Sequence, residues 1–164
     1  MVRTLGRSDA AHDILEELPE WFGIDRFTHE YVEAAATFPN YVAVAAPEDR
    51  SLTPGPNGAE APLDDVLGVL LLDQRYPTSA EVHLLAVRRK HHRAGIGRAL
   101  VRRVEDDLRA QGVRLLSVKT LGPSAHDPSF DQTRAFYAAC GFHPVEEFPD
   151  LWVDSPCLLM VKPL

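Results

Sequence analysis

The chain has 164 residues, of which 45% are hydrophobic and 25% are charged, and this balance suits one globular domain with a full core. Its formal net charge of −7 argues against a general nucleic-acid binder, because neutralising phosphates requires an excess of lysine and arginine. No apolar run approaches the roughly eighteen residues of a membrane span, and residues 1–7 lack a signal-peptide core. Two cysteines, Cys140 and Cys157, are too few for a disulfide framework. We therefore expect a cytoplasmic protein with reduced thiols and with neither a membrane nor a nucleic-acid partner.

Residues 2–5 and 41–46 are strand candidates, and two helices are expected between them. Ser8 or Asp9 can cap the first helix, which ends before Pro19, and Thr28 can cap the second. Apolar residues at helical spacing give each helix an inward face: Ala11, Ile14, Leu15 and Leu18 in the first, and Tyr31, Ala34, Ala35 and Phe38 in the second.

The middle of the chain begins with a segment, 47–65, that is rich in proline and glycine and almost free of apolar side chains. This composition predicts a surface loop. Strands are expected over 66–74 and 80–87, and the clearest helical pattern of the chain follows over 97–111. The inward positions of that helix are Ile96, Leu100, Val104 and Leu108, and the ion pairs expected on its outer face are Arg102 with Asp106 and Glu105 with Arg109.

The last third predicts a strand over 115–120, a loop over 122–130 and a helix over 133–140 that Asp131 caps. Gly141 stands where the end of this helix needs a left-handed residue. Two final strands, 143–147 and 157–161, are expected to flank a loop that holds Trp152. The resulting order, βααβββαβαββ, predicts an α/β (α+β) fold that combines strands and helices.

The most informative stretch lies where the strand ending at Val87 meets the helix after Gly97. A run of basic residues, 88–93, is followed by Gly95-Ile96-Gly97. Glycines let backbone N–H groups curl around an anion, and a helix start adds unpaired N–H groups and positive charge, so this junction predicts a phosphate cradle. A dinucleotide fingerprint would need glycine in place of Leu100, and the Gly-Lys-Ser/Thr of a P-loop is absent from the sequence. The alternative is an ordinary glycine turn beside a solvated basic patch.

Two motifs resemble the GCN5-related N-acetyltransferase (GNAT) family. Residues 92–97, His-Arg-Ala-Gly-Ile-Gly, resemble its pyrophosphate loop, Gln/Arg-x-x-Gly-x-Gly/Ala, although His92 departs from the first position. Residues 135–142, Ala-Phe-Tyr-Ala-Ala-Cys-Gly-Phe, resemble its Phe-Tyr-x-x-x-Gly-Phe element. The resemblance is strong over 66–147. It implies one GNAT domain over 1–164, with a mostly antiparallel mixed sheet of six to seven strands and about four helices.

The resemblance also implies a reaction, the acetyl-CoA-dependent transfer of an acetyl group to a primary amine of a small molecule or polypeptide by direct attack. Acetyl-CoA would be a co-substrate, and no metal is expected, because His91-His92 has no further ligand at suitable spacing. In the family, backbone groups matching Leu85, Ala86 and Val87 pair with pantetheine. The pyrophosphate would lie on the residues of the loop: His92, Arg93, Ala94, Gly95, Ile96, Gly97 and Arg98.

Catalysis of this reaction must first remove a proton from the amine, which costs roughly 4.6 kcal/mol for a lysine-like amine at neutral pH. Glu81 matches the position of the family's glutamate base, and the alternation of a strand places it on one face with His83, Leu85 and Val87. The alternative for Glu81 is a solvated charge where a strand begins. His83 is a second candidate base, and otherwise a half-buried histidine with satisfied hydrogen bonds.

Tyr137 matches the family's tyrosine near the thioester sulfur, which assists the departing thiolate; the alternative is an aromatic of the core. The asparagine that often precedes this tyrosine is missing, and Arg134 could instead reach a phosphate or lie in solvent. The aromatics placed to line an acceptor pocket are Trp21, Phe22, Tyr31 and Trp152, although each also suits a core.

Two other functions compete with this one. A non-catalytic acyl-CoA-binding or sensing domain would keep the loop without the base and the acid. A partner-binding domain would bind no cofactor. The sequence leaves the acceptor, the acyl length and a homodimer open.

Overall fold

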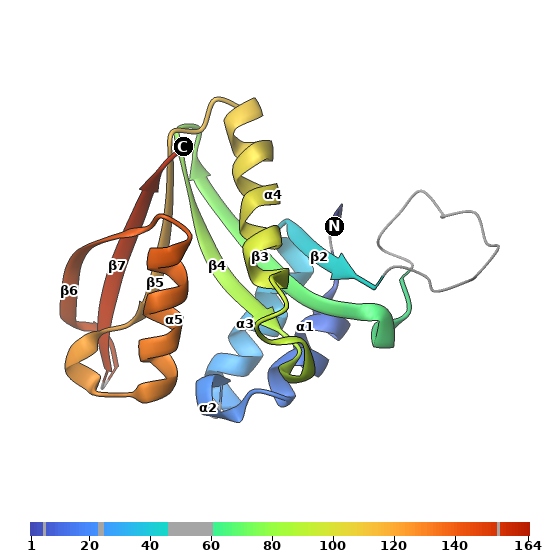
Figure 1. The fold of residues 1–164 in the computed structure, drawn as a ribbon, viewed down its shortest axis with the longest axis horizontal. Coiled ribbons are helices and arrows are strands. Elements are labelled where there is room, and N and C mark those ends of the chain that lie inside the picture. The colour runs from blue at the N-terminus through green and yellow to red at the C-terminus, as the bar shows by residue number, and fades with distance from the viewer. Residues whose placement is uncertain (5, 23–24, 46–60, 154) are drawn as a thin grey trace. The chain divides into compact units, whose positions relative to one another are not determined.

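The computed structural model describes residues 1–4, 6–22, 25–45, 61–153 and 155–164 (Figure 1). Its helices and strands follow in the order β1 Val2–Thr4, α1 Ser8–Glu16, α2 Pro19–Phe22, α3 Asp25–Thr37, β2 Asn40–Val44, β3 Val66–Tyr76, β4 Ser79–Val87, α4 Ile96–Ala110, β5 Leu115–Leu121, α5 Pro128–Ala139, β6 His143–Trp152 and β7 Ser155–Pro163. Single 3₁₀ turns are η2 Leu63–Asp65, η3 Arg89–His91 and η4 Pro123–Ala125. Most of the loop predicted over 47–65 lies outside the described residues.

The strands within the described ranges form one seven-stranded sheet in the order β1-β2-β3-β4-β5-β7-β6. The pairs β1–β2, β2–β3, β5–β7 and β6–β7 are antiparallel, whereas β4–β5 is parallel. The predicted mixed sheet is therefore confirmed, as is the predicted order of elements apart from the short helix α2. No helix of the described segments has the length and apolar content to cross a membrane.

The chain divides into two compact units. Unit 1 comprises Met1–Leu72 and Leu84–Val104, and unit 2 comprises Asp73–His83 and Glu105–Leu164. The core of unit 1 is built from the inward faces of α1 and α3 and from β2, β3 and β4, with fully buried side chains that include Ile14, Leu15, Ala35, Val42, Val69 and Leu71. The helical periodicity of the sequence correctly predicted the inward faces of α1 and α3.

The helix starts of unit 1 differ from the prediction. Arg7 occupies the cap position of α1 and no side chain caps the helix, because Asp9 instead accepts a 2.9 Å hydrogen bond from Nε of the buried Arg7. Thr28 lies inside α3, where its hydroxyl donates to the Phe22 carbonyl oxygen at 2.8 Å. Pro19 opens α2, since proline suits a first helical position that needs no N–H donor.

Unit 2 contains β5, β6, β7, α5 and parts of β3, β4 and α4. Its α5 begins earlier than predicted, because Asp127 rather than Asp131 is the cap: Oδ1 of Asp127 accepts hydrogen bonds from the amides of Ser129 at 2.8 Å and Phe130 at 3.2 Å. Gly141 has the predicted left-handed conformation, with φ of +91°. Strands β6 and β7 are longer than predicted, so Trp152 ends a strand instead of lying in a loop.

A buried charge network joins α4, α5 and β7 in unit 2. The predicted pair of Glu105 with Arg109 is present at 3.2 Å, but the Glu105 side chain is only 5% exposed and therefore does not lie on an outer face. Lys162 Nζ donates to Glu105 and, at 2.6 Å, to the Cys140 carbonyl oxygen. The network leaves Glu105 with two cationic partners, as a buried carboxylate requires.

Candidate functional site

The glycine loop of unit 1 leads from β4 through η3 into α4. Gly95 has φ of +83°, in the region that favours glycine, and its carbonyl oxygen accepts the first helical hydrogen bond from the Ala99 amide at 3.0 Å. Arg93 also has a left-handed backbone, with φ of +65°. The amides of Ile96, Gly97 and Arg98 precede the first intrahelical donor, so helix geometry leaves them available to an anion.

His92 has a structural partner on each side of the loop. Its Nε2 lies 2.8 Å from the carbonyl oxygen of Val87, at the end of β4, and its ring meets the Trp21 ring edge to face with centroids 5.9 Å apart. These contacts fold the first residue of the motif back onto the strand. They give a physical reason for histidine at a position where the family motif has glutamine or arginine.

The two arginines that open the basic run bind inside unit 1. Arg88 is buried and pairs with the carboxylates of Asp13 and Glu17. Burial opposes the charge of Arg88, but these two carboxylates outweigh it and raise the pKa of the guanidinium. Arg89 pairs with Glu20, and this hydrogen bond holds the pKa of Glu20 below its ordinary value. Arg88 and Arg89 are therefore engaged with acids of this unit, and the cradle prediction concerns residues 92–98 that follow them.

Strand β4 carries the candidate bases. Val82, Leu84 and Ala86 are buried, whereas the alternate positions, Glu81, His83, Leu85 and Val87, are partly exposed, so the predicted common face of these four residues is confirmed.

Glu81 forms an ion pair with Lys119 of β5, and their side chains are 25% and 34% exposed. The parallel register places Glu81 opposite Ser117, two residues before Lys119 on the same face of β5. Glu81 is therefore not the solvated charge of the alternative interpretation. Sequence reasoning missed Lys119, because the pair depends on a strand register that periodicity does not fix.

His83, on the same face as Glu81, is half-buried. Burial lowers the pKa of its imidazole, and the nearby carboxylates of Glu81 and Asp73 only partly oppose this effect. The ring therefore favours the neutral state, which is the state in which a histidine can accept a proton.

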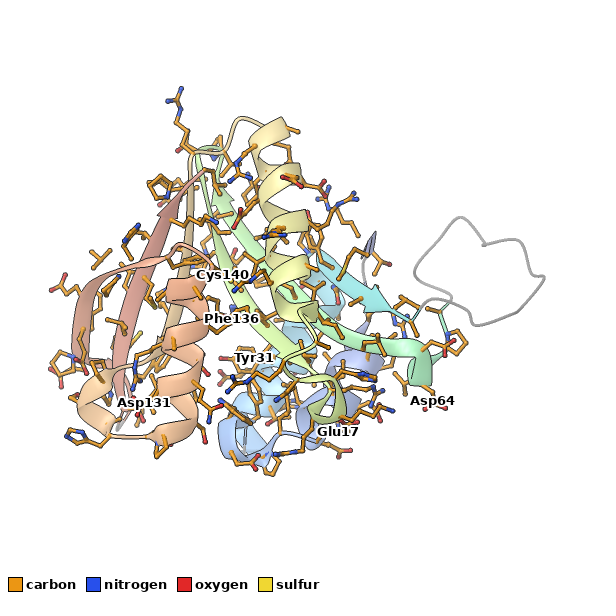
Figure 2. The ribbon with its side chains drawn as sticks, viewed as in Figure 1. Glu17, Tyr31, Asp64, Asp131, Phe136 and Cys140 are labelled. Atoms are coloured by element: carbon orange, nitrogen blue, oxygen red, sulfur yellow. The ribbon has the colours of Figure 1, made fainter. Side chains whose placement is uncertain are left out.

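Tyr137 is buried in α5, and its ring packs edge to face against Phe136 and Phe142, with centroids 5.2 Å and 5.4 Å apart. The predicted core packing is present, and the role of the hydroxyl stays a prediction. Figure 2 shows Asp131, Phe136 and Cys140 at successive levels of this helix. The Arg134 side chain does not extend into solvent. It donates to the Leu121 carbonyl oxygen at 2.6 Å and pairs with Asp131.

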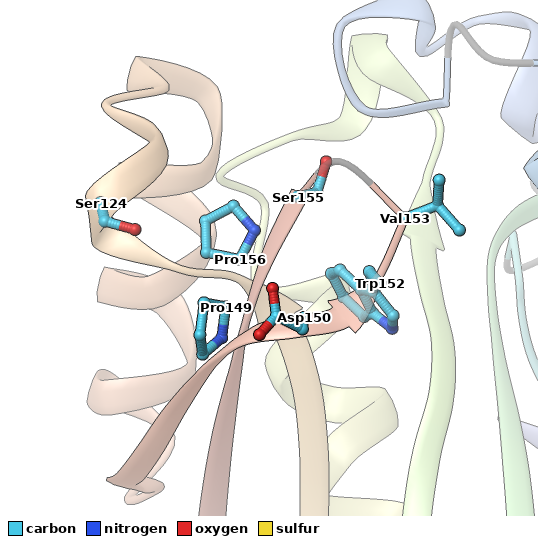
Figure 3. Close-up of a pocket in the computed structure, with 7 residues that line it drawn as sticks. All are labelled: Ser124, Pro149, Asp150, Trp152, Val153, Ser155 and Pro156. Atoms are coloured by element: carbon cyan, nitrogen blue, oxygen red, sulfur yellow. The ribbon is translucent and has the colours of Figure 1, made fainter.

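The predicted acceptor aromatics fall in both units. In unit 1, Trp21, Phe22 and Tyr31 are partly buried and pack against the core, with Phe22 and Tyr31 edge to face at 5.8 Å. In unit 2, Trp152 lines an open hollow of about 540 Å³ at the β6–β7 hairpin (Figure 3). The other lining residues are Ser124, Pro149, Asp150, Val153, Ser155 and Pro156.

Residues of η4 and β6 are tied together beside this hollow. The carboxylate of Glu147 on β6 accepts hydrogen bonds from the Ser124 hydroxyl and, at 3.2 Å, from the Ser124 amide. A Cβ on the neighbouring Gly122 would overlap the carboxylate of Glu147, so glycine leaves the space that this carboxylate fills. The sequence singled out Trp152 alone in this region.

Comparison with known proteins decides the family. The family model described as "Acetyltransferase (GNAT) family" matches residues 11–142, which is most of the chain. The protein is a member of the GNAT acetyltransferase family. No curated protein sequence matches it.

Solved structures of GNAT acetyltransferases share the fold over nearly the whole chain. A GNAT-family acetyltransferase structure from Desulfovibrio desulfuricans is 19% identical, with 98% of this chain and 96% of that chain covered and a TM-score of 0.69. An aminoglycoside 6'-N-acetyltransferase complexed with coenzyme A is 19% identical, with coverages of 99% and 97% and a TM-score of 0.66. The ribosomal-protein-S18-alanine N-acetyltransferase from Escherichia coli is 17% identical, with coverages of 98% and 93% and a TM-score of 0.66.

Proposed function

We propose that this GNAT protein transfers the acetyl group of acetyl-CoA to a primary amine of a small molecule or a polypeptide by direct attack. The observation that carries the proposal is the loop at the start of α4, where a left-handed Gly95 precedes three helix-start amides. Such amides bind phosphate oxygens well, and the match to the family model covers this loop. A solved neighbour of the same fold is complexed with coenzyme A, which supports the same co-substrate here.

The donor would bind through backbone groups. Residues 93–98 would hold the pyrophosphate, and the pantetheine amides would pair with the backbone of Leu85, Ala86 and Val87 in the manner of an added strand. The pairing of β4 with β5 supports this assignment. Their paired residues run from Ser79–Leu115 to Val82–Val118, whereas β4 continues to Val87. The last residues of β4 therefore extend beyond this pairing, where an added strand could bind.

The chemistry would require one proton transfer before bond formation. Glu81 would take a proton from the acceptor ammonium, which has the same charge as the Lys119 ammonium that now pairs with this carboxylate. The neutral amine would attack the thioester carbonyl, so that a carbon–nitrogen bond forms as the carbon–sulfur bond breaks, and the proton that the nitrogen then loses would pass to the departing CoA thiolate. Tyr137 would donate a hydrogen bond to the departing CoA thiolate. Holding amine and thioester together would supply much of the rate.

Two observations favour a second function, a non-catalytic acyl-CoA-binding or sensing domain. The ion pair with Lys119 occupies the carboxylate that catalysis needs, and Tyr137 has the contacts of a core residue. A sensing domain would bind the donor equally well and transfer nothing.

Isothermal titration calorimetry with acetyl-CoA and CoA tests donor binding. The wild type is compared with a Gly95→Glu, Gly97→Glu double variant, which places carboxylates in the cradle. Gly112→Glu is the matched control, because Gly112 also has a positive φ, of +79°, open space around it and a place at the other end of α4. We expect the double variant alone to lose binding. No binding by the folded wild type would contradict the proposal.

Mass spectrometry of a primary-amine panel then separates the two functions. The panel includes aminoglycosides and peptides with free N-termini. Acetylated product that depends on Glu81 supports the transferase, whereas donor binding without product on any amine supports the sensing domain.

A further inference from the structure

Three acids of α1 and α2 contact the residues with which the glycine loop starts. Asp13 lies on α1, Glu17 is the C-terminal cap residue of α1, four residues further on, and Glu20 lies on α2. All three pair with Arg88 or Arg89, directly after β4, and Figure 2 marks Glu17 in this region of unit 1. The sequence predicted no role for these acids.

The guanidinium of Arg88 is held on every side. Its side chain is 7% exposed, and besides the two carboxylates it donates to the carbonyl oxygens of Val66 at 2.7 Å and Leu63 at 3.1 Å. Its backbone amide donates to Leu67 at 2.9 Å. A charged group with this many partners at a nearly buried position has one accessible orientation, so the chain leaves β4 in a fixed direction.

Glu17 also holds the main chain of the loop. One carboxylate oxygen accepts the backbone amide of Arg89 at 3.2 Å, while the Glu17 carbonyl oxygen accepts Nε of Arg89 at 3.1 Å. A contact to a backbone amide fixes the path of the loop itself and not merely the position of a side chain. Further along, the Trp21 ring lies against His92, so the same helical segment meets the loop a second time.

We propose that Glu17, with Asp13 and Glu20, positions the acetyl-CoA loop through Arg88 and Arg89. These acids hold the start of the segment 92–98 so that its amides are arranged before the donor arrives. The inference rests on the proposed function, because it assumes that the loop binds acetyl-CoA. It assigns to the acids no contact with the donor.

The test is the Kd of acetyl-CoA for Glu17→Gln and Glu20→Gln, measured by calorimetry. Glu16→Gln is the matched control, because it removes the same charge one residue away on α1, where Glu16 is exposed and pairs with His12. We expect Kd to rise by about fivefold to tenfold for Glu17→Gln and to change by less than about twofold for Glu16→Gln. The charge exchange Glu20→Arg with Arg89→Glu should restore part of the binding lost by Glu20→Gln alone.

Hydrogen exchange gives a readout that a general loss of stability would not reproduce. Glu17→Gln should speed exchange of the His92 and Ala94 amides, which donate to the carbonyl oxygens of Arg89 and His91, while the buried amides of β2 and β3 keep their protection. If Glu17→Gln does not fold, Glu20→Gln carries the test, since its side chain is 45% exposed.

Three results would overturn the inference. An unchanged Kd for both variants would show that the acids do not position the loop. Tighter binding by Glu20→Gln would show that Glu20 competes with the donor for Arg89. Absence of binding by the wild type would overturn the proposed function itself, which the first two results would leave standing.

Discussion

At the scale of single residues, the carboxylate of Glu81 makes two interactions that a fully solvated carboxylate would not make. Its pairing with Lys119 keeps it on the partly exposed face of β4, and it is one of the two carboxylates that act on the neighbouring His83. The candidate base and the second candidate therefore belong to one electrostatic group, and substitutions at either position should be judged together.

Replacing Glu81 by Gln should reduce acetyl transfer without reducing donor affinity. The amide keeps the shape of the side chain but cannot take a proton, so we expect transfer at neutral pH to fall by about 100-fold. The rate is measured with the best acceptor of the amine panel, and the Kd of acetyl-CoA by calorimetry. Glu146→Gln, at an exposed position of β6, is the control. A rate within about threefold of the wild type would show that Glu81 is not the base.

The lowered pKa of His83 makes stability depend on pH. The unfolded chain binds a proton at His83 near its ordinary pKa of 6.5, whereas the folded chain binds it only at lower pH, so folding is favoured above this range. Stability should therefore fall as pH drops from about 6.5 through the folded pKa. Urea denaturation at several pH values checks this, and His83→Gln should flatten the dependence between pH 7 and 5. An equally steep curve for the variant would assign the effect to other groups.

At the scale of elements, the faces of helices were predictable, whereas the residues at which several helices start were not. The inward positions of α1 and α4 follow from local spacing, and the side chains of Ile14, Leu100 and Leu108 are fully buried. The residue at which a helix starts depends on which of several possible capping residues accepts hydrogen bonds from the first amides of the helix. Asp127 and Asp131 both precede the apolar part of α5, and the chain caps at Asp127 because Pro128 suits the first helical position.

The candidate site was predictable only where it is continuous in the sequence. The Gly95 turn and the alternation of β4 could be predicted, because each depends on neighbouring residues. The partners of Glu81 and Arg88 could not. The partner of Glu81 lies on β5, 38 residues away in the chain. The partners of Arg88 lie on α1 and at its end, 75 and 71 residues away, and only the folded arrangement brings them to Arg88.

Removal of the Asp127 cap should weaken α5. Asp127→Ala leaves the amides of Ser129 and Phe130 without their carboxylate acceptor, and we expect a loss of about 1 kcal/mol in the free energy of unfolding. The measurement is urea denaturation at neutral pH. Asp131→Ala, which removes an exposed partner of Arg134 in the same helix, should cost less than about 0.5 kcal/mol. Equal losses would argue against the cap.

At the scale of the whole molecule, an acidic chain carries a locally basic segment whose first two arginines are neutralised from within. The formal net charge is −7, and Arg88 and Arg89 pair with acids of α1 and α2. The basic run of the sequence therefore overstates the positive surface that a polyanion would meet.

The protein should consequently fail to bind duplex DNA. We expect no retardation of a short duplex in an electrophoretic assay at about 0.15 M salt, because the release of counterions that drives such binding needs several free lysines or arginines. Prior incubation with acetyl-CoA should make no difference. Retardation that weakens as salt is added would contradict this expectation.

The hydrogen bonds between Glu147 and Ser124 affect how a ligand would bind in the hollow at the β6–β7 hairpin. The carboxylate fastens η4 to β6, and Ser124 is itself part of the wall of the hollow. An incoming molecule would then meet one side of the wall already held by these hydrogen bonds, and binding would lose less free energy to the ordering of η4. The hollow would then discriminate between ligands by how well their shapes fit this preorganised wall. A close analogue of different shape would bind more weakly because it fits less well, and not because it fails to induce a conformational change.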